Sequence, residues 1–378
     1  MSEPLYVGLM SGTSLDAVDA ALVQFGDSVS LIATCEHPIP ETTRTEIAQI
    51  SAPGNDEIER LGPLDRRLGA LFAEATLNLL HKAELSPAAV TAIGSHGQTI
   101  RHQPASSGKP SEQAFTLQIG DPNSIAELTG ITTVADFRRR DIAAGGEGAP
   151  LAPAFHAAVF AQSSSNRAIV NIGGIANATV LQGDTLIGGF DTGPGNTLLD
   201  HWVKRHQGRP YDRDGGWSAE GVPQQALLEA LFQDPYFART GPRSTGKEQF
   251  HLAWLERALN RLDAIAPQDV QATLAELTAQ SIARGIKETG VVIDEVYVCG
   301  GGALNTDLMR RLYHHLPNTT LNTTATLGID PQWVEAAAFA WLAHQSMNSL
   351  AGNAPVVTGA DGYRVLGGIY PAGHCENP

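Results

Sequence analysis

The chain has 378 residues, of which 42% are hydrophobic and 17% charged, a balance that excludes global disorder and is typical of a globular protein. Its formal net charge of −15 argues against a nucleic-acid partner and against docking on anionic lipid, because both need a positive surface. The three cysteines follow no metal-binding pattern, no apolar run reaches the roughly 18 residues of a membrane helix, and the N-terminus does not resemble a signal peptide. We therefore expect a cytoplasmic protein with no membrane partner, although a local field can still admit an anionic substrate.

The first predicted element is a strand–turn–strand hairpin over residues 6–25, YVGLMSGTSLDAVDAALVQF. Its turn is not a Walker A loop, because the GK[ST] ending is missing. A plain hairpin turn needs only one glycine, so the glycine and hydroxyl cluster favours a turn that binds phosphate through backbone N–H groups and hydroxyls. The residues of this cluster are Gly8, Ser11, Gly12, Thr13 and Ser14.

Leucines at helical spacing predict a helix over residues 63–83, followed by a short buried strand that runs into the polar loop GSHGQTIRH. No acid or cysteine joins His96 and His102 at ligand spacing, which favours a structural or substrate-contacting role over a metal site. Gln98 and Thr99 lie at a strand end and are suited to hydrogen bonding a sugar. An exposed loop is expected over residues 105–112.

Residues 136–156 are rich in glycine, proline and charge, which is typical of a lobe boundary or an active-site loop. Three adjacent cations in this segment either contact a substrate carboxylate or phosphate, or are solvated charges or ion-pair partners of Asp136 and Asp141. On a strand, at most two of the three would share a face. These cations are Arg138, Arg139 and Arg140.

The opening pattern returns in AIVNIGGIANATVL, and two hairpins roughly 160 residues apart indicate an internal duplication. The motif GGFDTGPGNTLLD then places Asp191 at the end of an apolar strand, before a turn of Gly193, Pro194, Gly195 and Asn196. An Asp at such a turn is well placed to act as a general base or to hold a metal-bound water. The alternative is that Asp191 caps the following helix, which leaves the flanking glycines unexplained.

Two loops give weaker indications: Arg243 and Lys247 lie in a basic, glycine-containing loop, and Asp212 and Asp214 are candidate loop caps. Beyond them, a helix is expected over residues 271–289. The segment EVYVCGGGALN then predicts a strand that ends in a glycine turn at a helix N-terminus, an arrangement suited to a nucleotide. A final alanine-rich helix carries Glu335, which lies either at the helix surface or in a polar site.

The three glycine turns and the duplication resemble the acetate and sugar kinase/Hsc70/actin superfamily. More narrowly, GLMSGTSLDAVDAAL, GSHGQTIRH, ADFRRRDIAAGGEGAPLAPAFH, NIGGIAN, GFDTGPGN, STGKEQF and CGGGALN resemble the anhydro-N-acetylmuramic acid kinase family, from residue 8 to about 345. The resemblance implies an α/β fold of two duplicated ribonuclease-H-like lobes around an ATP cleft. The expected lobes are residues 1–136, completed by about the last ten residues, and residues 137–368, which carry the adenosine site.

The resemblance also implies that the enzyme uses ATP, Mg2+ and water to open the 1,6-anhydro ring and phosphorylate O6, giving N-acetylmuramic acid 6-phosphate for peptidoglycan recycling. The alternatives are another sugar or acyl-phosphate kinase of the same fold, or a non-catalytic ATP-driven scaffold. The expected partner is a small-molecule sugar, and a homodimer is our working expectation.

By this resemblance Asp191 is the general base and residues 12–19 form the first phosphate loop. We further expect Glu335 to be a second carboxylate that faces the substrate, and Gln98, Thr99 and Arg140 to contact the sugar or its lactyl group. Leu9 stands where the superfamily usually carries a metal-organising acid, so we expect Asp16 or Asp19, or Asp191 through a water molecule, to take part in the metal's coordination. The expected phosphate and nucleotide contacts are Ser11, Gly12, Thr13, Ser14, Leu15, Asp16, Ala17, Val18, Asp19, Gly193, Gly195, Asn196, Gly300, Gly301, Gly302 and Asn305.

Overall fold

The computed structural model describes residues 3–12, 15–26, 28–108, 110–239, 245 and 249–373. These residues divide into two compact units, one made of residues up to 159 together with those from 333 onward, and the other of residues 160–332. None of the helices in the described ranges is both long and apolar enough to cross a membrane.

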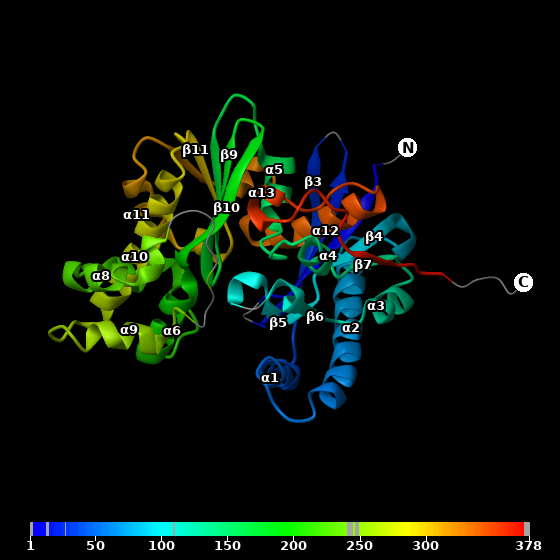
Figure 1. Ribbon diagram of the computed structural model, residues 1–378, viewed down its shortest axis with the longest axis horizontal. Coiled ribbons are helices and arrows are strands. Elements are labelled where there is room, and N and C mark those ends of the chain that lie inside the picture. Colours follow the sequence, from blue (N-terminus) through cyan, green and yellow to red (C-terminus); the bar gives the residue numbers. More distant parts are fainter. Residues whose placement is uncertain are drawn as a thin grey trace, which may run out of the picture. The chain divides into compact units, whose positions relative to one another are not determined.

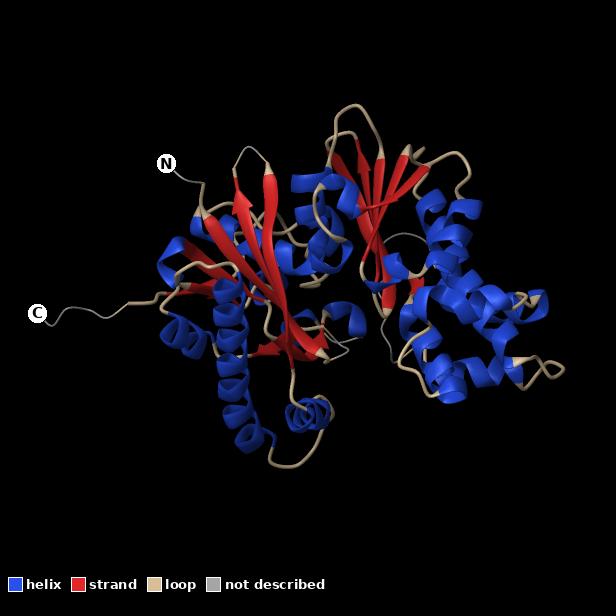
Figure 2. Ribbon diagram, turned by 180° about the vertical axis from the view of Figure 1, so that it is seen from behind, coloured by secondary structure: helices blue, strands red, loops and turns tan. Residues whose placement is uncertain are grey.

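The first unit contains a six-stranded sheet in the order β13-β7-β4-β1-β2-β3 (Figures 1 and 2). The first three strands form an antiparallel meander, and β4 and β7 continue the sheet in parallel with β1. The strands are β1 (Leu5–Met10), β2 (Ala17–Phe25), β3 (Val29–Pro38), β4 (Val90–Ser95), β7 (Thr133–Ala135) and β13 (Gly368–Tyr370), and a separate hairpin pairs β5 (Gln98–Gln103) with β6 (Phe115–Ile119).

Helices cover both faces of this sheet. Strand β1 alternates, so Val7 and Leu9 join the apolar core under α2, while Gly8 faces α12 on the other side. The helices of this unit are α1 (Glu41–Ile50), α2 (Glu57–Lys82), α3 (Pro122–Thr129), α4 (Arg139–Ala143), α5 (Ala152–Phe160), α12 (Val334–Met347) and α13 (Pro355–Thr358).

The second unit repeats this topology in a five-stranded sheet of order β10-β9-β8-β11-β12, again an antiparallel meander followed by two parallel strands. The repeat confirms the predicted α/β fold with two duplicated ribonuclease-H-like lobes. Its strands are β8 (Arg167–Ile172), β9 (Ile175–Gln182), β10 (Thr185–Pro194), β11 (Glu295–Cys299) and β12 (Thr320–Thr323), and its helices are α6 (Asn196–Gln207), α7 (Gly216–Glu220), α8 (Gln225–Phe232), α9 (Leu252–Leu259), α10 (Pro267–Glu288) and α11 (Thr306–His315).

Two apolar clusters hold the second unit together. One joins the sheet to α10 and α11, and the other lies among α6, α8, α9 and α10. Figure 1 shows α10 among the other helices of this unit, beside α8 and α11.

The units divide at different residues from the expected lobes, since residues 137–159 and 333–368 belong to the first unit. The physical reason is the close packing of α12 on β1 and β4. A Cβ at Gly8 would lie 1.8 Å from the carbonyl oxygen of Ala336, and one at Gly94 would lie 2.0 Å from that of Phe339. Two glycines therefore let the helix backbone rest directly on the sheet.

Candidate functional site

The opening turn of the first unit is a loop between β1 and β2, as predicted. Ser11 is buried and its Oγ donates a hydrogen bond of 2.6 Å to Oε1 of Gln98. The chain then reverses at Leu15, whose φ is 62° and whose N–H donates to the carbonyl oxygen of Gly12. The structure thus brings the predicted phosphate turn to the predicted sugar contact Gln98. Thr13 and Ser14 lie outside the described residues.

The two aspartates that follow the turn have different surroundings. Asp16 is exposed, and its Oδ1 lies 3.6 Å from Nη1 of Arg44. Asp19 is half-buried on β2, directly opposite Glu36 of β3. Burial raises the pKa of the Asp19 carboxyl to about 7, with further repulsion from Glu36 and Glu335. Asp19 therefore lies within electrostatic reach of Glu335, whereas Asp16 is engaged with a surface arginine.

Glu335 lies in the first turn of α12 and interacts electrostatically with Arg138. Its side chain keeps access to solvent, yet the surrounding protein raises the pKa of its carboxyl, and the positive charge of Arg138 opposes this rise. Glu335 and Asp19 thus form a pair of carboxylates in one unit.

Arg138 is held beside this pair by fixed contacts. Its Nη1 donates to the carbonyl oxygen of Gly148 at 2.9 Å, and its Nη2 lies 3.0 Å from Nε2 of His96. Burial and the Arg138 charge lower the pKa of His96 well below its usual value, so the imidazole is neutral and its Nε2 accepts from the guanidinium. Burial also lowers the pKa of Arg138 to about 10, which leaves it cationic at neutral pH.

The other two arginines of the triplet are placed differently. Arg139 and Arg140 begin the short helix α4, so the strand geometry considered from the sequence does not apply. Arg139 pairs with Asp136 at 3.4 Å, which is the alternative weighed for this segment. Arg140, the predicted substrate contact, is exposed.

The predicted sugar contacts Gln98 and Thr99 are neighbours on β5. Gln98 donates from Nε2 to the carbonyl oxygen of Thr99 at 3.2 Å, and the Thr99 hydroxyl accepts a hydrogen bond of 3.0 Å from Gln118. Both side chains are held by the protein in fixed orientations. His102, by contrast, contacts the hydroxyl of Thr116 at 3.1 Å, and burial followed by the Arg138 charge lowers its pKa to about 4.

In the second unit the turn that follows β10 packs against the turn between β8 and β9. The N–H groups of Gly195 and Asn196 donate to the carbonyl oxygens of Gly174 and Gly173, at 2.9 and 2.8 Å. A Cβ at Gly195 would lie 2.3 Å from the carbonyl oxygen of Gly173, so this approach requires glycine.

The late glycine turn packs on the same strand end. At Gly300 φ is 76°, and a Cβ there would lie 2.9 Å from the carbonyl oxygen of Ile172, to which the Asn196 side chain also donates. Asn305 caps α11, its Oδ1 accepting from the N–H of Leu308 at 2.9 Å. The turns at Gly195 and at residues 300–302 therefore pack around the end of β8, whereas Gly193 lies against Phe237 and Ser281.

Asp191 lies on β10 opposite Asn177, just before a bulge at Gly193. Its carbonyl oxygen accepts from the Tyr236 hydroxyl at 2.7 Å, and its carboxylate Oδ2 accepts from the backbone N–H of Thr245 at 2.8 Å. Helix α6 begins after Gly195 without a side-chain cap, so the alternative in which Asp191 caps this helix is wrong. Sequence reasoning missed Tyr236, which lies in an ordinary Asp-Pro-Tyr-Phe turn with no recognisable functional motif.

Other candidates are structural or lie outside the described ranges. Asp212 accepts hydrogen bonds from the N–H groups of Trp217 and Ser218, both at 2.9 Å, and is a loop cap as predicted. Arg243 and Lys247 lie outside the described residues. In the described ranges no group of three or more His, Cys, Asp or Glu side chains is placed to hold a metal ion.

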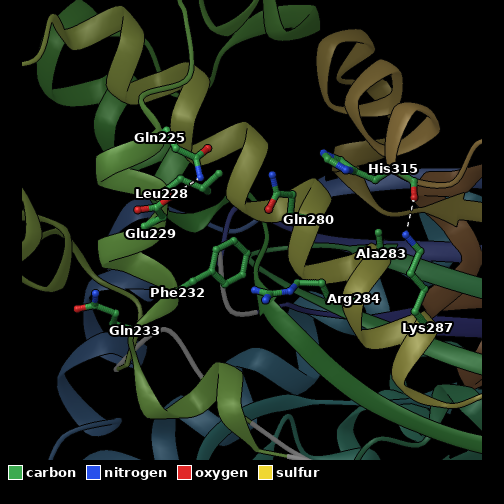
Figure 3. A pocket seen from close by; sticks show the side chains of 10 residues that line it. All are labelled: Gln225, Leu228, Glu229, Phe232, Gln233, Gln280, Ala283, Arg284, Lys287 and His315. Atoms are coloured by element: carbon green, nitrogen blue, oxygen red, sulfur yellow. Dashed lines mark hydrogen bonds between the residues drawn. The ribbon is translucent and has the colours of Figure 1, made fainter.

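A pocket of about 440 Å3 lies in the second unit between α8, α10 and the end of α11 (Figure 3). Arg284 lies over the ring of Phe232, with its guanidinium carbon 4.4 Å from the ring centroid. None of the predicted site residues lines this pocket. Its lining residues are Gln225, Leu228, Glu229, Phe232, Gln233, Gln280, Ala283, Arg284, Lys287 and His315.

Comparison with known proteins gives consistent matches along the chain. A family model described as anhydro-N-acetylmuramic acid kinase matches residues 4–372. The protein of that name from Shewanella halifaxensis is 52% identical over 377 residues, which cover 98% of this chain and 100% of the relative. The one from Pseudomonas putida is 52% identical over 368 residues, covering 97% and 99%.

Solved structures are more distant. Component A of the (R)-2-hydroxyglutaryl-CoA dehydratase of Acidaminococcus fermentans has a TM-score of 0.49 at 12% identity, covering 89% of this chain and 96% of that chain. An ROK hexokinase from Thermus thermophilus has a TM-score of 0.39 at 16% identity, covering 90% and 99%. The sequence relatives, not these structures, carry the assignment.

Proposed function

The chain belongs to the anhydro-N-acetylmuramic acid kinase family, and we propose that it opens the 1,6-anhydro ring of anhydro-N-acetylmuramic acid with water while transferring the γ-phosphoryl group of ATP to O6. The product is N-acetylmuramic acid 6-phosphate, as cell-wall recycling requires. The observation that carries the assignment of residues is the fixed geometry of Asp191, whose backbone and carboxylate are both hydrogen bonded.

In this reaction Asp191 takes a proton from a water molecule as the water oxygen attacks C1. The C1–O6 bond breaks, its electron pair goes to O6, and O6 attacks the γ-phosphorus while ADP leaves. One water, one sugar and one ATP thus give the 6-phosphate, ADP and the proton held by Asp191. Phosphoryl transfer asks little covalent chemistry of a protein, so positioning and charge stabilisation dominate.

The first unit supplies the phosphate turn and the charged groups beside it. We assign Ser11 and the backbone of the turn to the phosphates, Gln98 and Thr99 to the sugar, and Glu335 to the substrate side of the site. Arg138 replaces Arg140 as our preferred contact for an anionic substrate group, because Arg138 is a half-buried cation oriented by Gly148 and His96 near Glu335, whereas Arg140 is exposed.

A magnesium ion is compatible with this unit, because Mg2+ in phosphoryl-transfer sites commonly takes one or two carboxylates plus substrate phosphates and waters. Asp19 suits this role, since burial, followed by repulsion from Glu36 and Glu335, raises its pKa, and a cation would relieve that repulsion. Asp16 suits it less, because it is paired with Arg44. When bound, the ion would neutralise charge on the phosphates.

In the second unit we assign Gly193, Gly195, Asn196 and the glycine turn 300–302 to the nucleotide. Gly195 and Gly300 approach the carbonyl oxygens of Gly173 and Ile172, and the lack of side chains at these two turns suits the close approach of a nucleotide. Asn305 acts through the cap of α11. The use of Mg2+, a cytoplasmic location and a homodimer stay predictions.

The competing function is another sugar kinase of the same fold, since fold alone does not select a substrate. The test is ATP turnover with anhydro-N-acetylmuramic acid compared with plain N-acetylmuramic acid. We expect turnover with the anhydro sugar and little with the open sugar, and the reverse preference would refute the proposal.

A further inference from the structure

We propose that Asp234 anchors a hydrogen-bond network that positions Asp191 through two separate arms. The inference deepens the proposed function and rests on it, because it takes Asp191 as the general base. We call this set the Asp234 network, and its members are Asp234, Tyr236, Thr245, Gln249 and Trp254, all in the second unit.

The first arm holds the backbone of Asp191. The Oδ1 atom of Asp234 accepts from the N–H of Tyr236 at 2.9 Å, and the Tyr236 hydroxyl donates to the carbonyl oxygen of Asp191 at 2.7 Å. The Tyr236 ring is fully buried and packs edge-on against Phe237 and Phe250, with centroids 5.4 and 5.3 Å away. This aromatic packing makes the hydroxyl a rigid support for the strand at Asp191.

The second arm holds the carboxylate of Asp191. Gln249 donates from Nε2 to Oδ1 of Asp234 at 3.2 Å, and its Oε1 accepts from the Thr245 hydroxyl at 2.9 Å. The backbone N–H of Thr245 then donates to Oδ2 of Asp191 at 2.8 Å. Gln249 is thus the link that holds Thr245 where its N–H meets the base.

The hydrogen bonds to Asp234 fix the orientation of the Gln249 side-chain amide. Both carboxylate oxygens of Asp234 accept hydrogen bonds from N–H donors, so the amide NH2 of Gln249 faces Asp234 and its oxygen faces Thr245. The other carboxylate oxygen of Asp234 accepts from the indole N–H of Trp254 at 2.7 Å, which fixes the anchor itself. Every donor along both arms therefore has a matching acceptor.

The consequence concerns the ionisation and aim of the base. A backbone N–H donated to Oδ2 favours the charged carboxylate and restricts its rotation. Misplacement of a reacting group by about 1 Å can cost as much as about 100-fold in rate. Asp234, Tyr236, Thr245 and Gln249 are therefore positioning residues, which act on the reaction through Asp191.

The test compares Gln249→Leu and Thr245→Val with Thr245→Ser. Gln249→Leu breaks the second arm, Thr245→Val removes its hydroxyl but keeps the N–H, and Thr245→Ser preserves both groups as the matched control. For Gln249→Leu and Thr245→Val we expect kcat to fall about tenfold with little change in the KM for ATP. We also expect the acidic limb of the plot of kcat against pH to move to higher pH by about 0.5–1 unit. Thermal unfolding of each variant separates this effect from loss of folded protein.

Wild-type kcat and an unchanged acidic limb in both Gln249→Leu and Thr245→Val would overturn the inference. The Asp191→Asn variant distinguishes the role of Asp191 as the base from the role of the Asp234 network in positioning it. A wild-type kcat in Asp191→Asn would refute the role of Asp191 as the base. If Asp191→Asn is inactive but Gln249→Leu keeps the wild-type kcat, only the Asp234 network is refuted. In the Asp191→Asn background we expect Gln249→Leu to have no further effect, and the same tenfold loss there would also overturn the inference.

Discussion

The backbone N–H of Thr245 lies 2.8 Å from Oδ2 of Asp191 and donates a hydrogen bond to it, although 54 positions separate the two residues. This relationship joins β10 to a segment that sequence analysis ranked low. This hydrogen bond orients the carboxylate of Asp191, to which we assign proton transfer.

Asp191→Asn should reduce kcat by about 10²–10⁴-fold, because general-base catalysis is typically worth that much. The amide oxygen can still accept from Thr245, so the fold and the KM for ATP should change little. Measuring ADP release under saturating substrates, with circular dichroism on the same samples, tests this. An unchanged rate would remove Asp191 from the mechanism.

Gly300→Ala and Gly301→Ala should differ although they are neighbours. A Cβ at Gly300 meets the Ile172 carbonyl oxygen at 2.9 Å and requires a φ of 76°, so we expect a loss of about 1–3 kcal/mol in the free energy of unfolding. A Cβ at Gly301 has its nearest neighbour at 3.7 Å, and stability should change by less than about 0.5 kcal/mol.

The same pair tests the nucleotide assignment. If the nucleotide approaches this turn closely, Gly301→Ala should raise the KM for ATP without changing urea denaturation. A KM equal to that of the wild type would place the nucleotide away from Gly301.

Ser11→Ala should destabilise the first unit. Its hydroxyl is buried and donates to Oε1 of Gln98 at 2.6 Å, so its removal leaves a buried acceptor without this donor and costs about 1–3 kcal/mol. Ser107→Ala is the matched control, because its hydroxyl donates over the same 2.6 Å to Pro104 at an exposed position. Equal losses in urea denaturation without nucleotide would argue against burial as the cause.

The pH dependence of stability should change in Asp19→Asn. Burial, with repulsion from Glu36 and Glu335, raises the pKa of Asp19 from 3.8 to about 7. Because the pKa of Asp19 is higher in the folded than in the unfolded state, its protonated form adds to the free energy of unfolding. This contribution is fully present below about pH 3.8 and is lost as the pH rises through about 7.

The Asp19→Asn variant should therefore gain stability over the wild type as the pH rises from about 4 to about 8, in the absence of nucleotide and metal. Asp16→Asn, an exposed carboxylate next to the same turn, is the control for simple removal of charge. A constant difference between Asp19→Asn and the wild type across this range would contradict the assigned surroundings of Asp19.

Local patterns predicted much of this molecule. The two hairpins, the glycine turn before α6 and the long helices follow from residue spacing and from clusters of turn-forming residues, which act over a few positions. The resemblance of extended motifs identified the family that the comparisons confirmed. These local patterns do not predict contacts between residues that lie far apart in the sequence.

Three cases show why. The return of α12 to the first sheet depends on Gly8 and Gly94. The sequence pattern assigned Gly8 to the phosphate turn, but Gly8 lies within β1 and faces α12, which no local pattern indicates. Three adjacent arginines look alike, and only the contacts of Arg138 with His96 and Gly148 distinguish it. The Asp234 network combines side chains from separate segments, none of which forms a motif by itself.

The central claim is that water opens the anhydro ring in the same reaction that phosphorylates O6. The most direct measurement is turnover in ¹⁸O-labelled water, quenched early, with unlabelled product incubated in the same water as the control for exchange at the anomeric position. The account predicts one label on C1 of N-acetylmuramic acid 6-phosphate and none in its phosphoryl group. Label in the phosphoryl group, or a 6-phosphorylated product with no label on C1, would contradict it.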